Sequence, residues 1–173
     1  VIDGNLNLGA GLSSSAALET ATTLALQSLF DFEMSSVDVA TLCQRVEHRY
    51  ANVMCGIMDQ FASGLGRSNH ALLLDCRTLS HVNIPTNLEK YRIVIISSEV
   101  KRELTSSAYN ERRGQCEEGV ALLRQFDPSI ASLRDVTPDL FDAYGDQLSG
   151  IVLQRCRHVI TENARVLRAS AAL

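Results

Sequence analysis

The sequence has no long apolar run, no excess of basic charge and no paired-cysteine motif, and each absence excludes a class of protein. No apolar stretch approaches the roughly 20 residues of a transmembrane helix, so we expect no membrane partner. A formal net charge of −4 provides no basic surface for nucleic acid or an anionic membrane. The five cysteines never form C-x-x-C, which indicates reduced thiols in a cytoplasmic protein and argues against a disulfide framework or a zinc site.

Further absences concern the organisation and the start of the chain. The 173 residues contain no internal repeat and no low-complexity segment, and this length suits one domain, or one domain and part of another. The sequence also has no signal peptide and no initiator Met, and it opens on Val1-Ile2-Asp3-Gly4, as if inside a strand and turn. We therefore expect an N-terminal portion to precede these residues.

What the sequence does contain is a Gly-rich run followed by three serines and an apolar helical pattern. The run reads Leu8-Gly9-Ala10-Gly11-Leu12-Ser13-Ser14-Ser15-Ala16. Glycines let main-chain N–H groups approach an anion, a helix N-terminus favours negative charge, and serine hydroxyls bond phosphate oxygens or magnesium. No Lys follows the glycines, so this is not the usual P-loop. The alternative is a buried helix with a Gly-rich entry turn and an ordinary serine N-cap.

The hydrophobic periodicity predicts an α+β fold and not a doubly wound parallel sheet. A short helix is expected to end between Gly64 and Gly66, and the longer helices are expected over residues 14–29, 35–50, 104–125, 138–148 and 151–169. Strands are expected over residues 1–6, 70–76, 82–84 and 91–97.

Two carboxylates are candidates for chemistry. Asp59 follows a glycine and lies among apolar neighbours, where a carboxylate can accept the proton of a substrate hydroxyl or orient it for attack. The alternative for Asp59 is that it caps its own helix. Glu47 precedes it near the end of a predicted helix, and its alternative is a solvated side chain paired with a nearby Arg or His. We interpret Cys43 and His48 as packing residues.

Three stretches, in order, resemble the GHMP small-molecule kinases, and among them the galactokinase family. Residues 11–16, Gly-Leu-Ser-Ser-Ser-Ala, resemble its ATP-binding loop, and residues 55–61, Cys-Gly-Ile-Met-Asp-Gln-Phe, resemble the segment with its catalytic aspartate. Residues 101–116 resemble a stretch in which a Tyr contacts galactose. Two departures are Asn7, where relatives usually have Pro, and Ala108, where a Glu commonly precedes that Tyr.

The resemblance implies an enzyme that phosphorylates galactose at its anomeric hydroxyl, giving galactose 1-phosphate, with ATP and Mg²⁺ as cofactors. Its partners would be the small-molecule sugar and ATP, and neither nucleic acid nor a membrane. It makes Asp59 the catalytic residue, and it makes Gly56, Asp59 and Tyr109 the galactose contacts. Ser15 and Glu47 would be the magnesium ligands. The ATP phosphates would be bound by Gly9, Ala10, Gly11, Leu12, Ser13, Ser14, Ser15 and Ala16. Nothing in the sequence indicates the oligomeric state.

The resemblance also implies a two-part fold. Residues 1–84 would form the end of an N-terminal ribosomal-S5-like αβ domain, and residues 85–173 the beginning of a C-terminal αβ domain. The family's N-terminal Gly-Glu-His-Thr-Asp-Tyr signature and its C-terminal Gly-rich motif have no counterpart here, so we expect a fold truncated at both ends and inactive alone. Such a piece would expose a sheet edge and an apolar surface, which we expect a second copy or further chain to cover.

Three other functions stay open. The string Cys-Gly-Ile-Met-Asp-Gln disfavours mevalonate and homoserine kinases of the same superfamily, but not a kinase for another sugar such as N-acetylgalactosamine. A non-catalytic galactose and ATP sensor that binds a partner protein is a different class, whose members lack the pair found here as Ser15 and Ala16. The third alternative is a pair of buried helices without any ligand.

Overall fold

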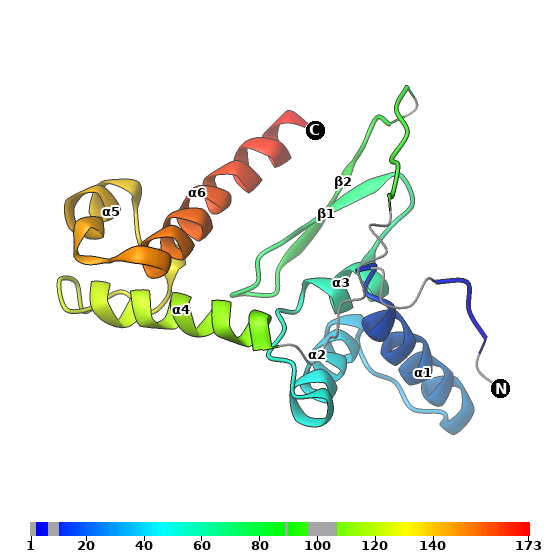
Figure 1. Cartoon of the computed structure of the whole chain (residues 1–173). Helices are drawn as coiled ribbons and strands as arrows, with labels where there is room; N and C mark the ends of the chain where they lie inside the picture. Colours follow the sequence, from blue (N-terminus) through cyan, green and yellow to red (C-terminus); the bar gives the residue numbers. More distant parts are fainter. Residues whose placement is uncertain (1–2, 7–10, 89, 97–106) are drawn as a thin grey trace. The chain divides into compact units, whose positions relative to one another are not determined.

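The structure, a computed structural model, describes residues 3–6, 11–88, 90–96 and 107–173 (Figure 1). It divides into two compact units, one formed by Val1–Ser106 with Leu173 and the other by Ser107–Ala172. This division follows contacts within the chain, and the domain boundary predicted between residues 84 and 85 stays a prediction.

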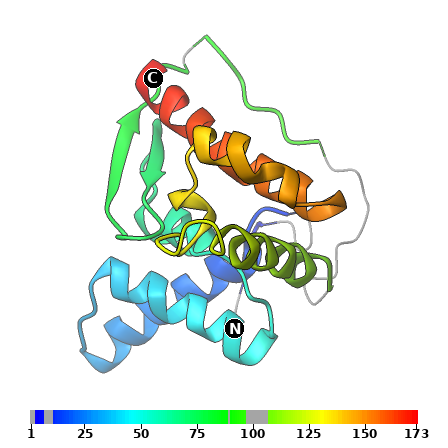
Figure 2. The same cartoon turned by 90° about the vertical axis from the view of Figure 1, so that its left-hand side faces the viewer.

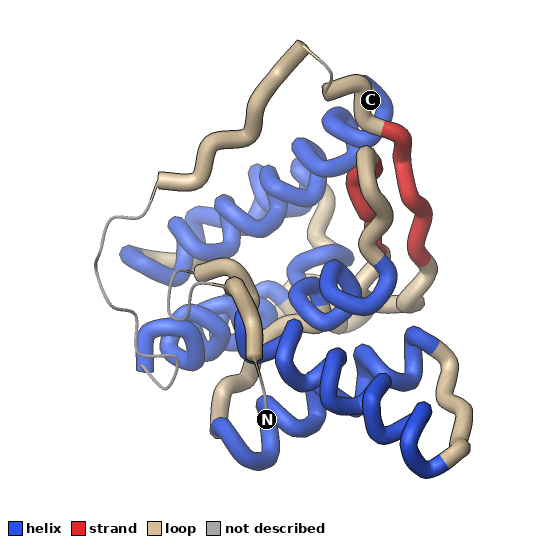
Figure 3. Tube along the Cα trace, turned by 90° about the vertical axis from the view of Figure 1, so that its right-hand side faces the viewer, coloured by secondary structure: helices blue, strands red, loops and turns tan. Residues whose placement is uncertain are grey.

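Three helices build the base of the first unit. They are α1 (Ser14–Phe30), α2 (Ser36–Val46) and α3 (Met58–Leu65), and a π-helical turn, η1 (Glu47–Ala51), continues α2. All three helices contact one another, and the tube in Figure 3 shows helices gathered in this part of the chain. Phe61 of α3 is fully buried and packs in one cluster with Ala40 of α2. The Ser35 hydroxyl caps α2 by accepting a hydrogen bond from the Asp38 N–H. The helices predicted in this part of the sequence are therefore confirmed.

A hairpin completes the first unit. Strands β1 (His70–Leu74) and β2 (His81–Pro85) pair antiparallel, with His70 opposite Pro85 and Leu74 opposite His81 (Figure 2). The Asp75 carboxylate fixes the turn by accepting hydrogen bonds from the N–H groups of Arg77 and Thr78, at 2.8 and 3.1 Å. Apolar side chains of β1 pack against the cluster around Phe61. The sheet therefore adds to the same core as the helices.

The strands predicted over residues 1–6 and 91–97 are wrong for the residues that the structure describes. Residues 3–6 and 91–96 form no strand, while Val1, Ile2 and Ser97 lie outside the description. Ile93, Val94 and Ile96 are 79%, 74% and 86% exposed, although their side chains favour strands. A strand forms only where a neighbour completes its hydrogen bonds, and β1 and β2 are the pair found in the described chain. High β-propensity is therefore not sufficient here.

Two long helices and three short ones make up the second unit. These are α4 (Ser107–Leu123), η2 (Leu133–Asp135), α5 (Pro138–Tyr144), η3 (Gly145–Gln147) and α6 (Gly150–Ala172). Their core holds Leu123, Leu133 and Cys156, all buried. The helices predicted here are confirmed, apart from residues 104–106, which lie outside the description. In the described parts of the chain, no helix is both long and apolar enough to cross a membrane.

Close packing of α4 on α6 depends on one glycine. A Cβ atom at the buried Gly119 would overlap the Cys156 sulfur and lie 3.4 Å from the Val152 methyl. We expect Gly119→Ala to lower the free energy of unfolding by about 1–3 kcal/mol, because overpacking outweighs the better helix propensity of alanine. Gly114→Ala is the matched control: it lies in the same helix with nothing within 4 Å, and should be neutral or stabilising. Urea denaturation of both variants tests this, and equal stabilities would contradict it.

Candidate active site

The entry to α1 has an unusual backbone. Gly11 and Ser13 both have positive φ, 73° and 56°, and Ser13 occupies the N-cap position without making a side-chain cap hydrogen bond. The alternative of an ordinary serine cap is therefore wrong. Left-handed residues before an uncapped helix N-terminus leave main-chain N–H groups available for an anion. Gly9 and Ala10, which the sequence also assigns to this loop, lie outside the described residues.

Glu47 is a buried carboxylate, with only 6% of its surface exposed. It opens the π-helical turn, and its carbonyl accepts hydrogen bonds from the N–H groups of Asn52 and Val53. Such turns inside helices occur frequently at functional sites. The alternative of a solvated Glu47 is therefore wrong, and burial of this charge requires a compensating interaction.

A second carboxylate lies near Glu47. Glu19 follows Ser15 by about one turn of α1, so the two side chains share a helix face. Burial, together with the charge of Glu47, raises the pKa of the Glu19 carboxyl to about 7. The Glu19 Oε2 atom is also buried and has no hydrogen-bond partner. The charge of Glu47 therefore acts on the α1 face that carries Ser15 and Glu19.

These residues fit a bound magnesium ion. Carboxylate and hydroxyl oxygens are its preferred protein ligands, and it keeps most of its coordination positions for water and phosphate oxygens. The buried Glu47 and the unpartnered Oε2 atom of Glu19 supply carboxylate oxygens whose charge a divalent cation would neutralise. Over the described ranges, no three His, Cys, Asp or Glu side chains gather as a larger metal site. A magnesium site with few protein ligands, one of them Glu47, is therefore consistent with these residues.

Asp59 lies in the first turn of α3, half-buried. The N-cap of this helix is Ile57, and no side chain makes a cap hydrogen bond there. The alternative of Asp59 as a capping residue is therefore wrong, and its carboxylate is not used in starting the helix.

The charges of Asp59 and Glu47 both act on the thiol of Cys55. Burial raises the pKa of this thiol above its usual range, and the charges of Glu47 and Asp59 raise it further, against a hydrogen bond from Gln60. Both carboxylates therefore act electrostatically on one sulfur atom. Glu47 and Asp59 thus share an electrostatic neighbourhood around this thiol, and α3, which carries Asp59, packs on α1.

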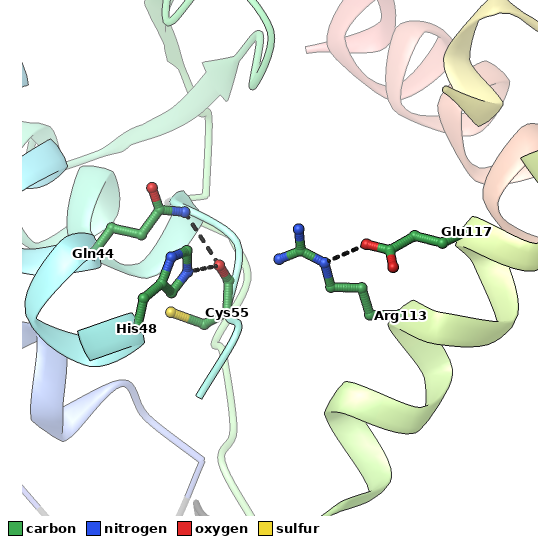
Figure 4. Close-up of polar contacts among 5 residues, drawn as sticks. All are labelled: Gln44, His48, Cys55, Arg113 and Glu117. Carbon is green, nitrogen blue, oxygen red and sulfur yellow. Dashed lines mark hydrogen bonds and ion pairs between the residues drawn. The ribbon is translucent and has the colours of Figure 1, made fainter. Parts of the chain in front are cut away.

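Gln44 and His48 contact this neighbourhood through the main chain. The Gln44 Nε2 atom lies 3.1 Å and the His48 Nε2 atom 2.9 Å from the carbonyl oxygen of Cys55 (Figure 4). The sequence predicts His48 to be a packing residue, and no role for Gln44 was predicted. Their spacing of one helical turn was the available signal, because it puts both side chains on one face.

The two other residues predicted to contact the sugar are Gly56 and Tyr109. Gly56 is exposed between Cys55 and the start of α3, next to the carboxylate neighbourhood in sequence. Tyr109 belongs to the second unit, where it lies in the first turn of α4 and is 49% exposed. Contact of either residue with a sugar stays a prediction.

Comparisons with known proteins place this chain in a class. Residues 1–67 match the model of the GHMP kinases N terminal domain. Residues 1–67 therefore form a GHMP kinase N-terminal domain. Its structure is similar to the crystal structure of Lactococcus lactis galactokinase complexed with galactose, with a TM-score of 0.91 and 36% sequence identity. That match covers 98% of this chain and 44% of the relative, so the chain is galactokinase-like and spans less than half of the relative's length.

The raised pKa of Glu19 predicts how stability depends on pH. The folded chain holds this proton up to about pH 7, whereas the unfolded chain releases it near 4.5, so the contribution of Glu19 to stability falls as pH rises between these values. We expect Glu19→Gln to unfold at higher urea than the wild type at pH 8 without metal, and to match it near pH 4.5. Glu33→Gln, on an exposed residue, is the control. No gain at pH 8 would contradict the burial of this carboxyl.

Proposed function

We propose that this chain provides the phosphate-binding loop and the catalytic carboxylate of a kinase that transfers the γ-phosphoryl group of ATP to the anomeric hydroxyl of galactose. The product is galactose 1-phosphate. The observation that carries the proposal is the left-handed, uncapped entry to α1 behind the Gly-rich loop, with the charge of the buried Glu47 acting on the same helix. The substrate class is taken from the similarity to a galactokinase with galactose bound.

The Gly-rich loop and the first turn of α1 would bind the ATP phosphates. GHMP kinases use ATP, and the uncapped N–H groups after Ser13 suit phosphate oxygens. The loop residues proposed for this role are Gly9, Ala10, Gly11, Leu12, Ser13, Ser14, Ser15 and Ala16. Ser15 and Glu47 would hold magnesium, which when bound neutralises charge on the phosphate oxygens. Much of the rate would then come from fixed positions and charge compensation.

Asp59 would act on the sugar hydroxyl. Its carboxylate holds the anomeric O–H and accepts the proton as that oxygen bonds to phosphorus, while the bond from phosphorus to the ADP oxygen breaks. Gly56 would let the main chain approach the sugar, and Tyr109 would pack on a sugar face and hydrogen-bond a hydroxyl. Each of these assignments is a proposal for the protein as a whole.

The test is a phosphotransfer assay on the complete gene product with ATP, Mg²⁺ and a panel of sugars, read by ³¹P NMR. We expect galactose 1-phosphate to form, and no product from methyl galactoside, in which a methyl group blocks the anomeric oxygen. If N-acetylgalactosamine is turned over faster than galactose, then N-acetylgalactosamine is the substrate. Binding of ATP and galactose without turnover would overturn the enzyme proposal and favour a sensor.

A further inference from the structure

We propose that Gln44 and His48 are positioning residues, which hold the segment from Cys55 to Asp59 in place for phosphoryl transfer through their joint hydrogen bonds to the Cys55 carbonyl. This inference rests on the proposed function and deepens it by adding two residues that support its catalytic carboxylate. Neither residue would touch substrate.

Both donors bind one oxygen atom. Gln44 donates from Nε2 at 3.1 Å and His48 from Nε2 at 2.9 Å (Figure 4). A carbonyl oxygen can only accept and has two lone pairs, so these two bonds complete its hydrogen bonding, and Nε2 of His48 must carry a proton. All three residues are partly shielded from water, where such bonds hold a segment more firmly than at an exposed surface.

The π-helical turn makes this arrangement possible. It separates Gln44, in the last regular turn of α2, from the chain reversal at Asn52, whose φ is 55°. After the reversal the chain passes back toward the helix, so that the Cys55 carbonyl faces His48. The same turn buries the Glu47 carboxylate next to His48 in sequence. One local distortion therefore produces both the burial of the predicted metal ligand and the carbonyl clamp, by which we mean the two hydrogen bonds from Gln44 and His48 to the Cys55 carbonyl.

Cys55 leads into α3. Its carbonyl attaches this segment to α2 and η1, and the buried Gln60 of α3 lowers the pKa of the Cys55 thiol against the effect of burial. Asp59 follows in the first turn of α3. Release of the carbonyl would let this segment shift, and a displacement of about 1 Å at reacting groups costs up to about 100-fold in rate.

The test combines isosteric removal of the donors with rescue. Gln44→Leu with His48→Phe, in the complete gene product, should lower kcat for sugar phosphorylation about 30-fold and leave KM for ATP within about twofold, because the Gly-rich loop is untouched. His48→Gln, which restores an amide N–H, should recover most of the rate lost in His48→Phe. His70→Phe is the control, because the exposed His70 ring hydrogen-bonds the carbonyl of Ser68, two residues away, and lies outside the proposed clamp.

Amide hydrogen exchange separates this inference from the proposed function. Without the clamp, exchange should rise in a peptide covering residues 53–61 and stay unchanged in one covering residues 36–43. Faster exchange with unchanged kcat would overturn the positioning role, and so would a loss of kcat that His48→Gln does not recover. If the wild type phosphorylates no sugar, the proposed function fails by that result. Unchanged exchange in the variant would then separately overturn the clamp.

Discussion

Asp59→Asn should lower kcat for galactose phosphorylation by about 10³-fold, within the range that general bases contribute. The amide has nearly the size of the carboxylate but cannot accept the hydroxyl proton, so KM for ATP should change little. Asp59 does not cap α3, so the substitution removes no helix-starting hydrogen bond. Initial rates at saturating ATP and galactose, with urea denaturation beside them, measure both effects.

The control for this variant is Asp139→Asn. Asp139 also lies in the first turn of a helix, α5, where it is exposed and outside the proposed site. It should lose at most the small helix-dipole contribution of a first-turn acid, about 0.3–1 kcal/mol of stability, with no loss of rate. An Asp59→Asn enzyme that keeps a tenth or more of the wild-type kcat would remove Asp59 from the mechanism and leave positioning as the source of the rate.

Local sequence patterns were sufficient for most of the helices and for the hairpin. The 3.6-residue period predicted α1 and α2 within a few residues, and Gly66 marks the end of α3 as expected. Both strands of the hairpin lie where strands were predicted, and the Asp75 carboxylate accepts the main-chain N–H groups of the turn between them. These features depend on neighbours in sequence, which is why periodicity and turn residues indicate them.

Features that depend on distant neighbours were not predictable in the same way. Residues 91–96 have strand-forming side chains, but a strand also requires a pairing partner, and composition cannot supply one. The burial of Glu47 and the clamp on Cys55 both depend on a π-helical turn, and no residue type near this turn predicts it. The left-handed backbone of Ser13 is likewise unexpected for a serine at an N-cap. Three of these departures lie in the candidate active site.

Glu47→Gln should weaken magnesium binding and, at the same time, raise the stability of the fold. As a ligand, Glu47 contributes a charge that glutamine lacks, so half-maximal activity should require about 100-fold more free Mg²⁺. Without metal at pH 8, the variant should unfold at higher urea than the wild type, because it relieves the repulsion that helps to raise the pKa of Glu19. A magnesium titration at fixed ATP and urea denaturation measure the two effects.

The opposite signs of these effects distinguish a ligand from a structural residue. A buried carboxylate kept for packing or hydrogen bonding would lose stability on substitution, since removal leaves its partners unsatisfied. Glu19→Gln provides the comparison: it relieves the same repulsion while Glu47 stays in place, so it should stabilise the chain with a much smaller change in magnesium dependence. If Glu47→Gln destabilises the protein and leaves the magnesium titration unchanged, Glu47 serves the fold, and the metal site must be sought elsewhere.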